Sequence, residues 1–287
     1  MKVRIIPRLD VKGDNLVKGV NMEGLRVLGK PQDFAKLYYE QGADELLLVD
    51  VVASLYGRGS ILEVIRATAS NMFIPLTVAG GLRTLDDITA VLRSGADKVA
   101  LNSAAIRRPE ILSEAVSRFG ASTIVLSVEV GRNLQGGYEA LIEYGRETTG
   151  LSALDWISQA AKLGIGELLI TAVHREGTGQ GLDIELLKRC RELATIPIIA
   201  GGGVGTREHV LEAFEKGGAD AVTLAGALHY PALRSMETNP EGYAQEGNIR
   251  YLMSAQKDTG FKGISGFSLP ELKEFLRERH VECRGVH

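Results

Sequence analysis

Two carboxylates, Asp10 and Glu129, stand where acid–base chemistry would need them. Asp10 ends the apolar run RIIPRLD and Glu129 ends the run TIVLSVE. If both runs are parallel strands of one barrel, the two side chains face each other across its mouth, the end at which the strands finish. Facing carboxylates in a site that also binds phosphate can have their pKa values pushed apart, which suits one for acid and the other for base work. The structural alternative is that each caps a neighbouring loop.

Glycine-rich turns follow four of the apolar runs and could bind anions. Backbone N–H groups at such turns can approach a phosphate closely, and the positive end of the next helix adds to the attraction. One glycine pair alone would indicate only a tight turn. Four at equivalent places in an internal repeat predict two phosphate sites. The residues expected to bind phosphate or substrate are Gly80, Gly81, Asn102, Ser103, Gly177, Thr178, Gly202, Gly203, Ala225 and Gly226.

Three more polar residues are expected at the same mouth. Asp50 ends the run LLLVD, while His174 and Glu176 follow the run ELLITAV. His174 could act as a general acid or contact the substrate through a hydrogen bond, and both interpretations stay open. The five histidines show no spacing with carboxylates that would specify zinc or iron, so neither a metal nor a cofactor is expected.

The elements that would position these residues alternate regularly along the chain. Eight short runs rich in Val, Ile and Leu are separated by helix-like segments such as PQDFAKLYYEQG and REHVLEAFEKGG. The segment IPLTVAGGLRTLDDITAVLRSGADKVAL, from Ile74, aligns with a second copy that starts at Ile196. Alternating strands and helices in two repeated halves predict a (β/α)₈ TIM barrel. A doubly wound open sheet is the alternative, but it would not predict near-identical halves.

Two stretches interrupt this regular spacing within the single domain, residues 1–287. Residues 12–30 follow the first strand and are polar and dotted with glycine, which predicts a mobile loop over the mouth. Residues 231–268 follow the eighth strand and are expected to form an insertion on the catalytic face. The insertion could serve as a lid, a specificity element or a partner contact, or it could be a surface elaboration.

Composition limits the function classes further. The chain has 45% hydrophobic and 24% charged residues with a formal net charge of -3, which indicates an ordinary globular protein rather than a nucleic-acid or membrane binder. Two distant cysteines, Cys190 and Cys283, suggest neither a disulfide framework nor a thiolate metal site. No signal peptide or membrane anchor is expected, and a cytoplasmic location is the natural interpretation.

Several motifs together carry a specific resemblance: RIIPRLDVKG, LVKGVN, GADELLLVDVVAS, FIPLTVAGGLR, GADKVALNSAA, TTGLSALDW and EGTGQG. They resemble the cyclase subunit of imidazole glycerol phosphate synthase, from histidine biosynthesis, over roughly Met1 to Tyr230 and again in the last helix. The sister isomerase of that pathway shares the two-phosphate barrel, but VKGVN, DVVAS and TTGLSALDW are more similar to the cyclase.

The resemblance implies an ammonia-dependent lyase and cyclase with a glutaminase partner at the N-terminal face of the barrel. Ammonia would pass through the barrel to a phosphoribulosyl-formimino aminoimidazole carboxamide ribotide, which carries a phosphate at each end. Asp10 matches the principal acid–base residue, Lys18 the lysine of the mobile loop, and Asp97 the partner-docking aspartate. The residues that match the family's ammonia gate are Arg4, Glu45, Lys98 and Glu167.

Departures from the family pattern gather at the mouth. Glu129 stands where the family has aspartate, Arg8 replaces a cysteine, and His174 and Glu176 replace two aspartates. Gly201 and Gly226 stand where serines contact phosphate. These changes leave two other interpretations open: a paralogue that uses ammonia on a different phosphorylated, sugar-type substrate, and a weakly catalytic barrel that mainly binds its glutaminase.

Overall fold

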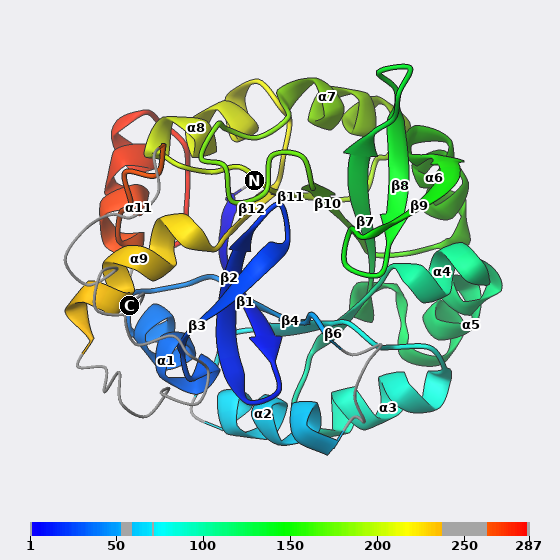
Figure 1. The fold of residues 1–287 in the computed structure, drawn as a ribbon, viewed down its shortest axis with the longest axis horizontal. Coiled ribbons are helices and arrows are strands. Elements are labelled where there is room, and N and C mark those ends of the chain that lie inside the picture. The colour runs from blue at the N-terminus through cyan, green and yellow to red at the C-terminus, as the bar shows by residue number, and fades with distance from the viewer. Residues whose placement is uncertain (1, 53–58, 71, 237–262, 286–287) are drawn as a thin grey trace.

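Eight parallel strands close into a barrel in the computed structural model, which describes residues 2–52, 59–70, 72–236 and 263–285 (Figure 1). The strands pair in the order β1, β4, β5, β6, β7, β10, β11 and β12, and β12 pairs back onto β1 to close the ring. Their bounds are β1 (Arg4–Lys12), β4 (Leu46–Asp50), β5 (Leu76–Ala79), β6 (Lys98–Leu101), β7 (Ile124–Arg132), β10 (Glu167–Ala172), β11 (Ile198–Gly201) and β12 (Ala221–Leu224).

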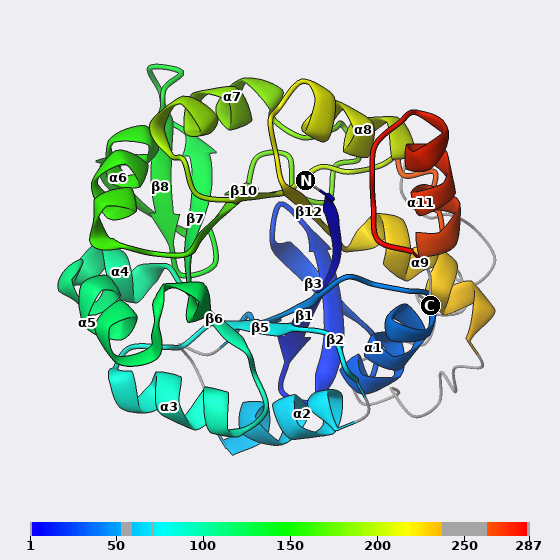
Figure 2. The ribbon, with the colours of Figure 1, turned by 180° about the vertical axis from the view of Figure 1, so that it is seen from behind.

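Helices surround these strands as an outer ring, which is visible from both sides (Figures 1 and 2). Thr84 and Asp87 form a reciprocal capping box that starts α3, as the sequence of that turn favours. The helices are α1 (Pro31–Glu40), α2 (Gly59–Ala69), α3 (Leu85–Arg93), α4 (Ser103–Arg107), α5 (Glu110–Phe119), α6 (Ala153–Ala160), α7 (Ile184–Leu193), α8 (Arg207–Glu215), α9 (Gly226–Ser235) and α11 (Leu269–Glu278). The predicted (β/α)₈ TIM barrel is confirmed.

Two β-hairpins extend the barrel at the mouth, one in each half. Antiparallel β2 (Asn15–Val20) and β3 (Glu23–Gly29) continue β1, and β8 (Tyr138–Ile142) and β9 (Glu147–Ser152) continue β7. The prediction of a loop over residues 12–30 was therefore wrong. The strands β1 and β7 also run past Asp10 and Glu129 rather than ending there, because each pairs with its hairpin beyond the barrel rim.

Two hydrophobic cores result from the alternation of side chains along the strands. Outward residues such as Ile5 and Leu9 pack against the helices, while inward residues such as Ile6, Leu169 and Ile199 fill the barrel. The inner core contains a layer of apolar side chains between the charged N-terminal end and the polar mouth.

The last described helix ties the C-terminal part of the chain to the N-terminal end of the barrel. Lys273 of α11 is fully buried and donates to the Gly42 carbonyl at 2.6 Å and to Asp44 at 2.8 Å. A parallel β-bridge joins Val3 to Cys283. No helix among the described residues is long and apolar enough to cross a membrane.

The predicted insertion is described only at its ends. Helix α9 runs through Pro231 to Ser235, so the first residues of this stretch are helical, and residues 237–262 lie outside the described residues. The end of the stretch packs on the barrel mouth, where Ser265 N–H donates to the Gly205 carbonyl at 2.9 Å.

Candidate active site

Strand geometry explains why β1 carries residues for both ends of the barrel. Alternate residues of a strand point to the same face, so Arg4, Ile6, Arg8 and Asp10 all project inward. Arg4 joins the charged groups at the N-terminal end, Ile6 belongs to the inner core, and Arg8 contributes to the cavity at the mouth. Each of these inward residues therefore lies two residues further along the strand, and so closer to the mouth, than the inward residue before it.

Asp10 is almost fully buried and has a partner on each carboxylate oxygen. Arg8 Nε donates to Oδ1 at 2.7 Å, and the Tyr144 hydroxyl donates to Oδ2 at 2.9 Å. Arg8 also approaches Thr171 at 3.5 Å. The two opposite charges form a close, buried ion pair. The Arg8 replacement therefore supplies a permanent cation beside the principal predicted acid–base residue.

Glu129 has an environment of a different kind. Its Oε2 accepts from Asn102 Nδ2 at 2.9 Å and from the Gly145 amide at 2.8 Å. Burial raises the pKa of Glu129 to about 7 and the negative charge of Asp10 adds to that rise, although Arg8 and the two hydrogen bonds oppose it. A carboxyl group with a pKa near 7 can give or take a proton in neutral solution.

Lys18 reaches the mouth from hairpin β2–β3. Its Nζ lies 2.6 Å from Glu176 Oε1 and both side chains are buried. Burial acts to raise the pKa of Glu176, but the charges of Lys18 and Arg8 and the hydrogen bond from Lys18 together outweigh it and lower that pKa below its usual value. The hairpin also contacts the loop that follows β10, because its Asn21 N–H donates to the Glu176 carbonyl at 2.7 Å.

The first-half glycine turn opens on a cavity at the mouth. A Cβ at Gly80, whose φ is +99°, would lie 2.3 Å from the Asp50 carbonyl oxygen, so only glycine fits there. Ser103 begins helix α4 and its hydroxyl accepts from the Glu143 amide. Of the predicted site residues, those that line this one cavity are Arg8, Asp50, Gly80, Gly81, Asn102, Ser103 and Glu129.

The second-half glycine turn has the same backbone geometry. A Cβ at Gly202 would lie 2.6 Å from the Ala172 carbonyl oxygen, which repeats the Gly80 arrangement at the symmetry-related place. Gly226 begins helix α9 after Ala225, and Lys18 and Ile264 lie beside it. Gly203, Gly177 and Thr178 occupy adjacent turns, where Thr178 donates to the Arg175 carbonyl at 2.7 Å. The predicted second phosphate site is therefore next to Lys18.

His174 does not line the described cavity. Its Nε2 lies 3.2 Å from Asp183, the residue that caps helix α7, and its Nδ1 is buried without a hydrogen-bond partner. Burial acts to raise the pKa of Asp183, but the hydrogen bonds from His174, the Leu186 amide and Tyr138 together outweigh it and lower that pKa well below its usual value. His174 therefore contacts a structural carboxylate in this conformation, and a role toward substrate stays a prediction.

Sequence reasoning missed several cavity residues. Tyr144 and Arg146 lie in the turn of hairpin β8–β9, Ser127 and Thr171 are inward residues of β7 and β10, and Arg107 lies in α4. Ser127 and Thr171 could have been found from period-two alternation once Glu129 was placed. Nothing in the local sequence of Tyr144 indicates that its turn reaches the barrel axis.

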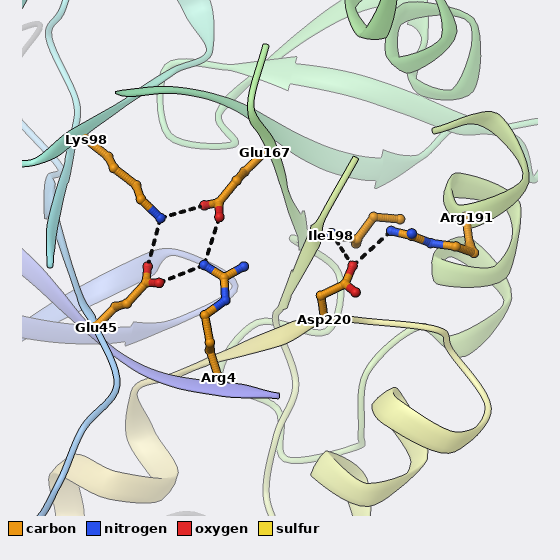
Figure 3. Close-up of polar contacts among 7 residues, drawn as sticks. All are labelled: Arg4, Glu45, Lys98, Glu167, Arg191, Ile198 and Asp220. Carbon is orange, nitrogen blue, oxygen red and sulfur yellow. Dashed lines mark hydrogen bonds and ion pairs between the residues drawn. The ribbon is translucent and has the colours of Figure 1, made fainter. Parts of the chain in front are cut away.

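Four charged residues at the N-terminal end form what we call the charged ring: Arg4, Glu45, Lys98 and Glu167 (Figure 3). Arg4 Nη1 lies 2.7 Å from Glu45 and 2.8 Å from Glu167, and Lys98 Nζ lies 3.2 Å and 3.1 Å from the same two carboxylates. Cations and anions therefore alternate around the barrel axis. Arg4, Lys98 and Glu167 are the first residues of their strands and Glu45 immediately precedes β4, so all four lie at the end opposite the cavity.

Asp97 lies beside this ring on the outer surface. Its carboxylate accepts from the Leu76 amide at 2.8 Å, much as Asp220 accepts from the Ile198 amide in the second half (Figure 3). Asp97 is exposed and lines a shallow groove with Phe73, an aromatic side chain that is 89% exposed. Within the described residues, no group of three or more His, Cys, Asp or Glu side chains could hold a metal ion.

Comparisons with known proteins agree with this geometry. The model of the histidine biosynthesis protein family matches residues 4–234. The chain is 50% identical over 206 residues to subunit HisF of imidazole glycerol phosphate synthase from Legionella pneumophila, covering 72% of this chain and 97% of that protein. It is 44% identical over 266 residues to HisF of Corynebacterium glutamicum (strain R), covering 91% and 97%, and 41% identical over 238 residues to HisF of Streptococcus sanguinis (strain SK36), covering 83% and 94%. The chain therefore belongs to the histidine biosynthesis protein family, among the HisF subunits of imidazole glycerol phosphate synthase.

Proposed function

We propose that the chain is the ammonia-dependent lyase and cyclase subunit of imidazole glycerol phosphate synthase. It converts a phosphoribulosyl-formimino aminoimidazole carboxamide ribotide into imidazole glycerol phosphate and the aminoimidazole carboxamide ribotide. The observation that carries the proposal is the pair of buried carboxylates, Asp10 and Glu129, in a mouth with a glycine turn on either side. The comparisons give no support to a different, sugar-type substrate.

The two carboxylates supply the proton transfers that ring closure requires. Ammonia must lose protons after it attacks a carbonyl carbon, and the departing oxygen must gain them. As the ring closes, the C–N bond to the aminoimidazole ribotide breaks, and the leaving nitrogen must gain a proton. Asp10, ion-paired with Arg8, acts as the principal base, and Glu129 gives or takes the second proton. Proton transfer by such positioned groups contributes about 10²–10⁴-fold to a rate.

The glycine turns hold the two phosphates of the substrate. Gly80, Gly81 and Ser103 bind one phosphate, and Gly202, Gly203 and Gly226 bind the other, with Lys18 beside the second site. Gly201 and Gly226 carry no hydroxyl, so backbone amides provide more of the binding energy at this second site.

Ammonia enters from a glutaminase subunit at the opposite face. The charged ring stands at that entrance and the apolar layer around Ile6 and Leu169 leads to the mouth. Asp97 and the neighbouring exposed Phe73 belong to the surface that contacts the glutaminase. An apolar path excludes bulk water, so ammonia stays in its uncharged, nucleophilic form.

One assay tests the proposed reaction directly. The purified chain is mixed with an ammonium salt and the bisphosphate ribotide, and both products are followed by mass spectrometry. Formation of imidazole glycerol phosphate without any glutaminase is the expected result. An absence of both products at saturating substrate and ammonium would contradict the assignment.

Replacing Lys98 by methionine tests the ring. We expect glutamine-dependent turnover with the glutaminase present to fall at least fivefold relative to ammonium-dependent turnover, because two buried carboxylates lose a cation and rearrange across the entrance. Lys188→Met, at an exposed position of α7, is the matched control and should leave this ratio unchanged. Equal losses of both activities in the Lys98 variant would show that the ring does not control ammonia passage.

A further inference from the structure

A single turn of hairpin β8–β9 contacts both predicted acid–base residues. The Tyr144 hydroxyl donates to Asp10 Oδ2 at 2.9 Å, and the amide of the next residue, Gly145, donates to Glu129 Oε2 at 2.8 Å. Asp10 accepts hydrogen bonds on both of its oxygens, whereas the hydrogen bonds that Glu129 accepts from Asn102 and Gly145 both end on Oε2. Consecutive residues thus link the two carboxylates across the mouth.

The backbone of this turn has an uncommon conformation. Glu143, Tyr144 and Gly145 have φ values of +52°, +60° and +73°, in the left-handed region that non-glycine residues rarely adopt. Such a conformation persists only where the surrounding structure holds it, and it is concentrated at functional sites. The sequence of the turn therefore does not by itself favour the shape that brings Tyr144 to Asp10.

Contacts on both sides of the turn hold it in place. The Glu143 carboxylate pairs with Arg107 at 2.8 Å, its amide donates to Ser103 Oγ at 3.1 Å, and Arg146 donates to the Val51 carbonyl at 2.9 Å. Met22 of hairpin β2–β3 packs against the same turn near Tyr144. The anchors come from three different βα units, so the turn is fixed relative to the barrel as a whole.

We propose that the turn 143–146 sets the relative position of the two acid–base carboxylates, with Tyr144 as the positioning residue for Asp10 and the Gly145 amide as the positioning group for Glu129. This inference rests on the proposed function, because it requires Asp10 and Glu129 to act on one substrate. Tyr144 acts through Asp10, whose second oxygen is held by Arg8. A carboxylate held at both oxygens cannot rotate freely, so its orientation relative to Glu129 is fixed before substrate binds.

A double-mutant cycle tests the role of Tyr144. Tyr144→Phe removes only the hydroxyl, and we expect it to lower kcat about tenfold in the ammonium assay while KM changes less than twofold. The same substitution made together with Asp10→Asn is expected to have no further effect on the residual kcat, because its partner carboxylate is already absent. The midpoint of urea unfolding, measured without substrate, should show the same non-additivity.

Tyr138→Phe is the matched control, since Tyr138 lies on the same hairpin and its hydroxyl donates to a different carboxylate, Asp183, at 3.0 Å. This control should leave kcat within twofold with or without Asp10→Asn. Equal tenfold losses from Tyr144→Phe in both backgrounds, or a rise in KM of more than fivefold, would overturn the inference and indicate direct contact with substrate. If the wild-type chain gives no turnover, the proposed reaction is refuted. The positioning role is tested separately by urea unfolding, and additive midpoint shifts for Tyr144→Phe and Asp10→Asn would refute it.

Discussion

Asp10→Asn is expected to lower kcat of the ammonium-dependent reaction about 10³-fold, with little change in KM. The amide has nearly the same shape but cannot accept a proton, and the loss lies within the range that general acid–base catalysis contributes. The ion pair with Arg8 would also be lost, which leaves a buried cation without its counter-charge. Steady-state kinetics with varied ribotide at saturating ammonium would measure both constants.

The control for this variant is Asp14→Asn, an exposed carboxylate just beyond the end of the same strand. It should retain at least half of the wild-type kcat. Retention of more than a tenth of the activity by the Asp10 variant would remove Asp10 from the role of principal base and leave Glu129 as the candidate.

Glu129→Gln is expected to make the protein more stable than wild type at alkaline pH. The pKa of Glu129 is raised to about 7 by burial, so folding favours its protonated form. Stability from this group is fully present below its unfolded pKa, near 4.5, and is lost as the pH rises through about 7. Glutamine stays neutral and avoids this loss, which amounts to about 3 kcal/mol for a shift of this size.

Urea unfolding at pH 5 and at pH 8.5 measures this difference. The free energy of unfolding of Glu129→Gln, relative to that of wild type, should be higher at pH 8.5 than at pH 5. Glu63→Gln, at an exposed position of α2, should show no such change. A pH–rate profile of the wild type should also contain an ionisation near pH 7. A constant stability difference across this range would show that Glu129 is not buried as a neutral acid.

The barrel could be predicted because its signals are repeated. Runs of Val, Ile and Leu mark all eight barrel strands, and the two copies that start at Ile74 and Ile196 support one another. The hairpins could not be predicted in the same way, since β9 reads ETTGLS, has no buried residue and shows no apolar alternation. Turn residues Glu143 and Tyr144 adopt positive φ without being glycine or asparagine, so no turn rule indicates them.

Site residues could be placed on the mouth from the sequence, but their partners could not. The two-residue spacing between Arg8 and Asp10 indicates only that both side chains point inward from β1. Tyr144 is separated from Asp10 by 134 residues and reaches it through a hairpin that belongs to the other half of the barrel. Long-range contacts of this kind depend on closure of the whole barrel, which local sequence patterns do not predict.

The charged ring has an internal asymmetry that bears on how such a barrel could arise from a duplicated half. Glu45 in GADELLLVD corresponds to Glu167 in GIGELLITA, so both halves supply one carboxylate. Lys98 in GADKVAL corresponds to Ala221 in GADAVTL, a buried residue that carries no charge. A chimera built from two copies of the second half would keep both carboxylates but carry neither Arg4 nor Lys98, so two buried anions would face each other at its entrance without a cation between them.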